Sequence, residues 1–371
     1  MNFFIILLVI EVTITFALHI YHESKSNENE KETIQNDNLI ERKYGARDYS
    51  QIYPDYSVEK IHELHNETYK RNFYYDPYLQ FREKPFTGKH VNVSKHGYRK
   101  SPYNKNWPPN KNHFNIMIFG GSTAFGYGVD DQDTIGTKLN FFLNQEYGDR
   151  VVVYNFGCAW YYSTQERILL ENILLNEVDI DLALFLDGLN DVQMFTNEPA
   201  LTNNMLQLFN HANIESVFPY NTGIMRVIRK IGGTSKYNDI QYIQPDQDFD
   251  PEKIAQRLIK NHSLISSVCD SNNIETYFFI QPIPDYMYDD QYHYYPSSKE
   301  YKNKRSRFYK VLKNKIIGVD YLNYHWLADM QKDIKIPLYI DNVHYSPHMS
   351  EKIADKIFNT IREKITFINE P

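Results

Sequence analysis

The residues with the clearest chemical potential begin at Ser122, which follows the apolar run IMIF (116–119) in the sequence FNIMIFGGSTAFGYG. A phosphate-binding loop needs G-x-x-x-x-G-K-[ST], and Gly121 to Gly126 has the glycine spacing but Tyr127 at the lysine position. A dinucleotide turn needs G-x-G-x-x-G, which this stretch does not contain. What remains is a serine on a tight turn at a strand end, close to a helix N-terminus that favours developing negative charge. Ser122 is therefore a candidate nucleophile, and the alternative is a serine that only caps the next helix.

A serine nucleophile needs a base, a group that orients the base, and donors for an oxyanion. Asp341 and His344 lie three residues apart in YIDNVHYSP, on a turn that leads into a helical stretch. His344 is the candidate general base, and Asp341 is the carboxylate that would hold its tautomer and stabilise the imidazolium form. Gly157 and Asn190 follow two further apolar runs, and they offer a backbone N–H and a side-chain amide. Each residue alone also has an ordinary structural explanation, as a turn or a cap, so the hypothesis depends on their combination.

Four short apolar runs alternate with helical stretches, and these elements would have to position the candidate residues. The runs lie at 116–119, 151–156, 182–187 and 276–282, and the helical stretches at about 134–147, 163–176, 251–269 and 298–315. Apolar runs without polar alternation are typical of strands covered on both faces, and their alternation with helices is typical of parallel crossovers. The sequence therefore predicts a doubly wound α/β sandwich, in which ligands bind beyond the carboxyl ends of the strands.

Composition limits the class of protein. With 371 residues and 42% hydrophobic content, the chain can bury a full core and is expected to hold one large domain with additions. The net charge of -7 and the pI near 6.0 give no electrostatic footprint for nucleic acid, so we expect no nucleic-acid partner. The two cysteines, Cys158 and Cys269, are too few and too isolated for a cysteine-based zinc site or a disulfide framework.

The residues before the regular pattern divide into three segments. Residues 1–21 contain a largely apolar stretch about long enough to span a membrane, and the lack of an A-x-A-like cleavage site favours an uncleaved anchor over a signal segment. We therefore expect a membrane-anchored, extracytoplasmic protein. Residues 22–45 have the polar, charged composition of a tether. Residues 46–112, rich in Tyr, Pro and Asn, predict an irregular lead-in subdomain, and 113–371 form the main domain.

Four sequence blocks together resemble the SGNH/GDSL hydrolase superfamily, in the GGST form found among bacterial surface members. The blocks are GGST, the glycine after the second apolar run, G-x-N-D after the third run, and D-x-x-H near the C-terminus. The resemblance covers roughly residues 114–365. It implies a flavodoxin-like three-layer α/β/α sandwich and ester cleavage or acyl transfer, without a metal or cofactor. It also implies a triad and an oxyanion hole: Ser122, Asp341 and His344, and the N–H of Ser122, the N–H of Gly157 and the side chain of Asn190. Many members carry G-D-S, whereas this chain has Gly121 before the serine, so any role of that aspartate is absent.

An ordinary α/β-hydrolase is the alternative fold, since GGSTA comes within one residue of the G-x-S-x-G elbow. In that fold several strands should precede the elbow, and the acid should lie well apart from the histidine. Here the serine follows the first predicted strand of the sheet, and the acid and histidine share one late turn, so we favour the SGNH interpretation.

The predicted function is that of a serine esterase or O-acyltransferase acting on an acylated small molecule or glycan, with O-acyl groups of a surface polysaccharide as the leading substrate. Trp160, Tyr161 and Tyr162 could stack on a sugar, and the long segment 194–250 could form a lid. The alternative function is that of a non-catalytic binding or assembly protein that keeps the fold.

Overall fold

The computed structural model describes residues 49–104, 107–206 and 248–369. The chain divides into two compact units, of which the first comprises Met1–Asp37 and Leu201–Pro245 and the second Asn38–Ala200 and Asp246–Pro371. Only residues 201–206 of the first unit are described, so the fold below is that of the second. The expected membrane segment, the tether and most of the 194–250 segment lie outside the described residues. Within the described ranges, none of the helices has the length and apolar character that crossing a bilayer requires.

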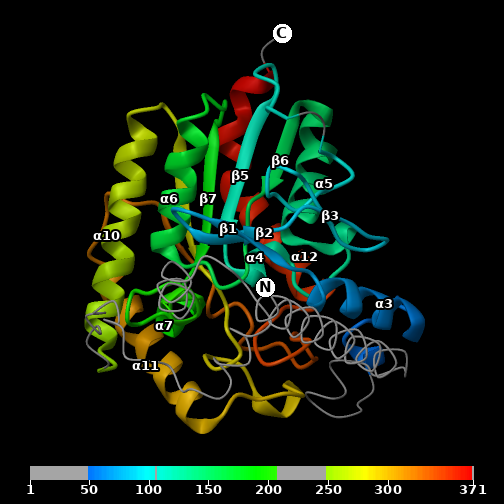
Figure 1. Cartoon of the computed structure of the whole chain (residues 1–371), viewed down its shortest axis with the longest axis vertical. Helices are drawn as coiled ribbons and strands as arrows, with labels where there is room; N and C mark the ends of the chain where they lie inside the picture. Colours follow the sequence, from blue (N-terminus) through cyan, green and yellow to red (C-terminus); the bar gives the residue numbers. More distant parts are fainter. Residues whose placement is uncertain (1–48, 105–106, 207–247, 370–371) are drawn as a thin grey trace, which may run out of the picture. The chain divides into compact units, whose positions relative to one another are not determined.

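Five parallel strands form the main sheet of the described chain, and Figure 1 shows three of them, β5, β6 and β7, side by side. Their order is β6-β5-β7-β8-β9, which is 2-1-3-4-5 by position in the chain and defines the flavodoxin-like type of doubly wound sheet. The order reverses between β5 and β7, and such a reversal opens a crevice at the carboxyl ends of the two strands. The bounds are β5 Phe114–Gly120, β6 Val151–Asn155, β7 Leu182–Asp187, β8 Glu275–Ile280 and β9 Tyr324–Trp326.

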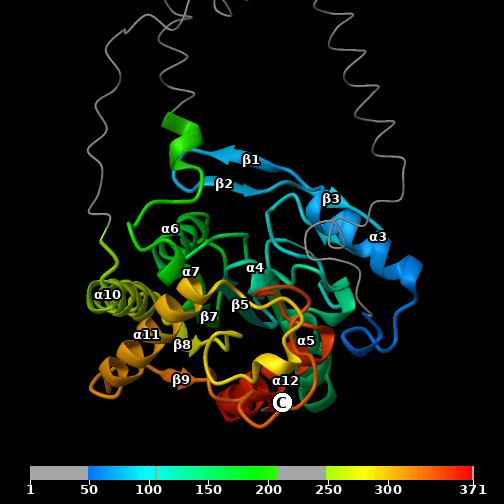
Figure 2. The same ribbon diagram turned by 90° about the horizontal axis from the view of Figure 1, so that it is seen from below.

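Helices cover both faces of this sheet. Figure 2 shows α5 and α12 on one side of it and α6 and α10 on the other. The bounds are α5 Ile135–Tyr147, α6 Ser163–Leu174, α10 Pro251–Asp270, α11 Lys299–Ile316 and α12 Pro347–Ile361, and α11 packs on α10. Every residue of β5, β6 and β7 is buried, which is why these strands read as unbroken apolar runs. The predicted α/β sandwich with a parallel sheet is confirmed.

The helices begin at capping residues that the sequence supplies. The Thr134 hydroxyl accepts a hydrogen bond from the N–H of Thr137 at the start of α5, and Ser346 accepts one from Met349 at the start of α12. Such caps satisfy N–H groups that have no partner within the helix. Pro347 follows its cap directly, at a position where a proline lacks no needed N–H. The cap at Ser346 fixes where the turn before α12 must end.

The lead-in residues form a helix and two small antiparallel ladders. The elements are α3 Val58–Tyr69, β1 Phe73–Asp76, β2 Gln80–Glu83, β3 Phe86–Thr87 and β4 Asn92–Val93. β1 pairs with β2 and β3 with β4, and Arg99 bridges both Val93 and Asn155. The lead-in therefore continues the sheet beyond its β6 edge, through backbone pairing at the carboxyl end of β6.

Candidate active site

Three of the predicted residues lie within hydrogen-bond distance of one another. The Ser122 Oγ is 2.8 Å from the His344 Nε2, and the His344 Nδ1 is 2.6 Å from the Asp341 Oδ2. Ser122 is the first residue of the short helix α4 (Ser122–Phe125), directly after β5. Asp341 and His344 lie on a tight turn that the backbone hydrogen bond from Ile340 N to His344 O closes at 2.9 Å. The end of β5 and the turn before α12 thus bring a hydroxyl, an imidazole and a carboxylate into line.

The carboxylate of Asp341 is held at both oxygens. Its Oδ1 accepts hydrogen bonds from the N–H groups of Val343 and His344 at 2.9 and 2.8 Å. Its Oδ2 accepts from His344 Nδ1 and, at 3.1 Å, from the hydroxyl of Tyr69 on α3. Burial alone would raise the pKa of Asp341, but the neighbouring His344 ring and these N–H donors outweigh it and hold that pKa well below its usual range. Asp341 is therefore ionised at neutral pH, and it directs the Nε2 lone pair of His344 toward Ser122.

The imidazole of His344 is also held by packing. The ring of Tyr127 stacks on it, with ring centroids 5.4 Å apart and an angle of 20° between the planes. The Tyr127 hydroxyl donates to Glu83 Oε1 at 3.1 Å, so β2 fixes the orientation of the tyrosine. Tyr127 thus supports His344. In a phosphate-binding loop, a lysine would occupy the position of Tyr127.

Asn190 lies beside Ser122 at the topological reversal of the sheet. It belongs to α7 (Leu189–Gln193), which follows β7, and its Nδ2 donates to the carbonyl of Tyr161 at 2.7 Å. An amide group has two N–H donors, so one remains for a ligand. A Cβ on residue 121 would lie 2.2 Å from this Nδ2, so the close approach of Asn190 requires the glycine at position 121. This contact gives a physical reason for a glycine directly before Ser122.

Gly157, the other predicted oxyanion donor, is engaged elsewhere. Its N–H donates to the Asn155 side chain at 3.0 Å, and it is absent from the residues that line the pocket at Ser122. A Cβ at this position would lie 2.3 Å from the backbone nitrogen of Phe125, so the glycine permits close packing against α4. Gly157 therefore does permit a close approach, as the sequence predicts, but what approaches it is the backbone of α4 and not a reacting group.

Trp160 lines the pocket three residues further on and adopts a left-handed backbone conformation with φ 59°. Within the described residues, its N–H has no hydrogen-bond acceptor. A bulky residue at positive φ is uncommon and tends to mark functional sites. Sequence reasoning considered only the Trp160 ring, because no sequence pattern indicates a tryptophan in this conformation.

The pocket at Ser122 measures about 330 Å³ and is bordered by the sheet domain and the lead-in together. Tyr69, Arg71 and Phe73 contribute to its wall from α3 and the start of β1. Trp160 is 40% exposed, whereas Tyr161 and Tyr162 are buried. Of the three aromatic residues proposed to stack on a sugar, only Trp160 is therefore available to a ligand.

The lead-in also holds the loop that carries Trp160. The N–H of Ala159 donates to Glu83 Oε1 at 3.3 Å, and the Tyr161 hydroxyl donates to the carbonyl of Phe81. The ring of Phe81 contacts the ring of Trp160 with a centroid separation of 6.2 Å. Strand β2 therefore fixes this loop from the residue before Trp160 to the residue after it, a contribution that the sequence did not reveal.

A buried acidic cluster lies behind Asn190. The His262 Nε2 is 2.8 Å from Asp187 Oδ2, and Ser163 donates to Asp191 Oδ1 at 2.6 Å. Burial and then the charge of Asp187 raise the pKa of Asp191 to about 6, and the same two causes raise the pKa of Glu166 well above its ordinary value. The cluster thus retains protons above the pH at which exposed carboxyls lose them. In the described part of the chain, no group of three or more His, Cys, Asp or Glu side chains is arranged to hold a metal ion.

Comparisons with known proteins give a likeness of fold. No family model matches the sequence, and no curated protein matches it. The acetyl xylan esterase AlAXEase is 14% identical over 67% of this chain and 100% of its own, with a TM-score of 0.41. The psychrotrophic esterase EstA from Pseudoalteromonas sp. is 13% identical over 68% of this chain and 98% of its own, with a TM-score of 0.38. The carbohydrate acetylesterase Est24 from Sinorhizobium meliloti is 12% identical over 68% and 99%, with a TM-score of 0.37.

Proposed function

We propose that this chain is a serine ester hydrolase that works through an acyl-enzyme at Ser122. The observation that carries the proposal is the continuous hydrogen-bonded chain from Ser122 Oγ through His344 to Asp341, with distances of 2.8 and 2.6 Å. A serine hydroxyl is a weak nucleophile until an adjacent base takes its proton, and this arrangement supplies the base and the group that orients it.

The reaction follows from the positions of these groups. The Ser122 Oγ attacks the acyl carbonyl while His344 Nε2 takes the hydroxyl proton, and the imidazolium gives that proton to the leaving alkoxide as the C–O bond breaks. Water then attacks the acyl-enzyme, again losing its proton to His344, and Ser122 is regenerated with release of the acid. Asp341, ionised and buried, stabilises the imidazolium in both halves of the reaction.

We assign the oxyanion donors to the N–H of Ser122, the second N–H of Asn190 and the N–H of Trp160. All three residues line the pocket, and the N–H of Gly157 is already bonded to Asn155. A well-placed donor is worth about 3–4 kcal/mol in the transition state. Trp160→Gly keeps the backbone N–H and suits positive φ, so it should retain kcat on a small ester within about threefold, whereas Asn190→Ala should lose about a hundredfold.

We further propose O-acyl groups of a carbohydrate outside the cytoplasm as the substrate. The half-exposed ring of Trp160 beside Ser122 suits the apolar face of a sugar, and the apolar stretch within residues 1–21 suggests a membrane anchor. Hydrolysis and acyl transfer share the same acyl-enzyme and differ only in whether water or a sugar hydroxyl accepts the acyl group. Product analysis with an acetylated oligosaccharide and a competing unacylated acceptor distinguishes them.

The direct test uses purified full-length protein, p-nitrophenyl acetate and a fluorophosphonate probe. We expect turnover of the ester and labelling at Ser122, with both lost in Ser122→Ala. A folded sample that is not labelled, or a Ser122→Ala variant that turns over at the wild-type rate, would contradict the proposal and favour a non-catalytic binding protein.

A further inference from the structure

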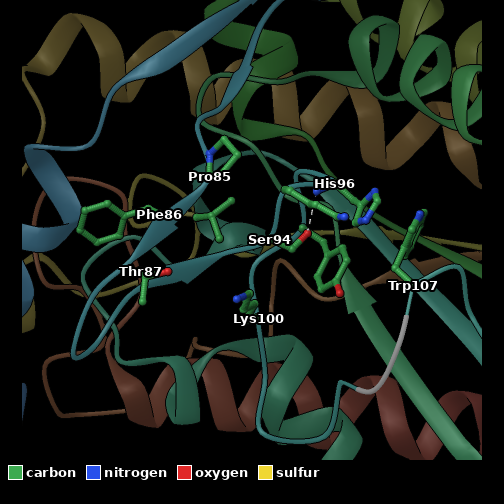
Figure 3. A pocket seen from close by; sticks show the side chains of 10 residues that line it. Pro85, Phe86, Thr87, Ser94, His96, Lys100 and Trp107 are labelled. Carbon is green, nitrogen blue, oxygen red and sulfur yellow. Dashed lines mark hydrogen bonds between the residues drawn. The ribbon is translucent and has the colours of Figure 1, made fainter.

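A second pocket lies in the lead-in, formed by β3, β4 and the turn that follows β4. It measures about 540 Å³, and Figure 3 shows its side chains, with Ser94 and His96 close together and Trp107 beyond His96. Its volume exceeds that of the pocket at Ser122, which is about 330 Å³. We propose that this second pocket binds acidic carbohydrate.

The charge of the pocket is the first reason. Lys95 and Lys100 both line it, and none of its ten lining residues is acidic. Neither lysine forms an ion pair with a residue in the described ranges, so an acidic ligand would not have to displace a carboxylate of the protein. Arg82 is a third cation next to the pocket, outside its lining, and its Nη2 donates to the backbone carbonyl of His96 at 2.9 Å. An anionic group in this pocket would therefore meet uncompensated positive charge.

The positive charges near the pocket also affect the protonation of His96. Burial lowers the pKa of His96, and the positive charges of Lys95 and Arg82 lower it further. The imidazole is therefore neutral at neutral pH and presents an aromatic face, while the lysines carry the charge. The pocket combines two cationic side chains with an aromatic ring that does not compete for the same anion.

The aromatic wall is the second reason. The rings of His96 and Trp107 stack with centroids 5.2 Å apart and an angle of 25°, and Tyr98 lies 5.5 Å from Trp107. Tyr154 and Phe156, at the end of β6, contact the Trp107 ring at 5.6 and 5.5 Å and hold it in place. A rigid aromatic surface binds the C–H face of a pyranose ring at little entropic cost. A sugar acid has both features that the pocket matches, a carboxylate for the lysines and an apolar ring face for the aromatic wall.

The second pocket and the candidate active site flank one strand. On β2, Arg82 contacts His96 at the second pocket, whereas its neighbour Glu83 contacts Tyr127 and Ala159 at the active site. Successive residues of a strand point to opposite faces, so neighbouring residues of β2 contact the two different sites. If the proposed esterase function holds, the second pocket would bind an unacylated part of the same acidic glycan and raise the local concentration of its esters.

The test measures binding without catalysis. Full-length protein is titrated calorimetrically with tetragalacturonate at low ionic strength, where exposed charges are least screened. We expect saturable binding, a dissociation constant at least tenfold higher for Lys95→Gln/Lys100→Gln, and weak binding of the fully methyl-esterified tetrasaccharide. The matched control is Lys260→Gln/Lys310→Gln on α10 and α11, which removes the same charge and should bind like wild type. Trp107→Ala should weaken binding as well. Turnover of p-nitrophenyl acetate by Lys95→Gln/Lys100→Gln should match that of wild type.

Three results would overturn the proposal: no binding of tetragalacturonate at millimolar concentration, an equal loss in the control variant, or equal affinity for an oligodeoxythymidylate of the same charge. The last would show a general polyanion surface. Because the titration needs no turnover, failure here would leave the esterase proposal intact. Failure of the esterase test would likewise leave the binding result valid.

Discussion

Replacing Asp341 by Asn tests the candidate triad most sharply, because the structure dictates which way the new amide must lie. The Oδ1 position accepts hydrogen bonds from two backbone N–H groups, of Val343 and His344, at 2.9 and 2.8 Å. An amide NH₂ at the Oδ1 position would face two N–H donors. The oxygen of Asn must therefore occupy the Oδ1 position, and its NH₂ must occupy the Oδ2 position. There it can only donate to His344 Nδ1, which forces the proton onto Nε2. His344 would then donate to Ser122 instead of accepting its proton.

The expected loss is large, because the base is present but in the wrong tautomer. We expect kcat for p-nitrophenyl acetate to fall by about 10³–10⁴, or about 4–5.5 kcal/mol at 1.36 kcal/mol per decade. Fluorophosphonate labelling of Ser122 should slow by a similar factor, while the urea midpoint shows whether the fold is kept. The exposed Asp320→Asn is the matched control and should leave both rates unchanged. A loss below tenfold for Asp341→Asn in a folded protein would refute the tautomer argument.

Three further predictions concern the surroundings of the triad. Gly121→Ala places a Cβ 2.2 Å from Asn190 Nδ2, so it should displace the amide and lower kcat about a hundredfold in steady-state assays, as Asn190→Ala does. Tyr69→Phe removes the hydroxyl that donates to Asp341 at 3.1 Å, so kcat should fall about tenfold, with the acid limb of the kcat/KM profile moving to higher pH; an unchanged profile would contradict a role in the triad. Burial and a neighbouring carboxylate raise the pKa of Asp191 to about 6, so its folded form binds a proton more tightly than its unfolded form. The contribution of Asp191 to the free energy of unfolding should therefore decrease as the pH rises from about 4 to above 6, by about 3 kcal/mol. Urea titrations measure it as the difference between wild type and Asp191→Asn, and a difference that does not change over this pH range would contradict the prediction.

The main sheet could be predicted from sequence because its strands are buried on both faces and read as unbroken apolar runs. The three-residue strand β9, Tyr324–Trp326, escaped prediction because all three of its residues are only half-buried and form no apolar run. The helix α3 escaped for a related reason, since its buried face includes His65 and Thr68 as well as Ile61 and Leu64. The buried residues of α3 keep the helical spacing i, i+3, i+4 and i+7, but only two of the four are apolar, so the apolar pattern alone is incomplete.

Some residues of the candidate site could be predicted from sequence and others could not. Roles that depend on the type of a residue were predictable, whereas roles that depend on a contact between distant residues were not. A base and a carboxylate were recognisable from His344 and Asp341 on one late turn, and an amide from Asn190 after a strand end. The support that Tyr69 gives to Asp341 joins residues 272 positions apart and has no local signature. The assignment of an oxyanion donor to Gly157 or Trp160 depends on which N–H is already bonded, and only coordinates show this.

The separation of Ser122 from His344 along the chain also affects when activity can arise during synthesis. The two residues are 222 positions apart, and the hydrogen bond between them joins the start of the sheet to the last turn before α12. At about 5–20 residues per second, a ribosome needs roughly 10–45 seconds to pass from one to the other. A nascent chain therefore carries Ser122 without its base for most of its synthesis, and a chain that terminates before residue 344 has no base. Esters in the compartment of synthesis meet the complete site only after translation is nearly finished.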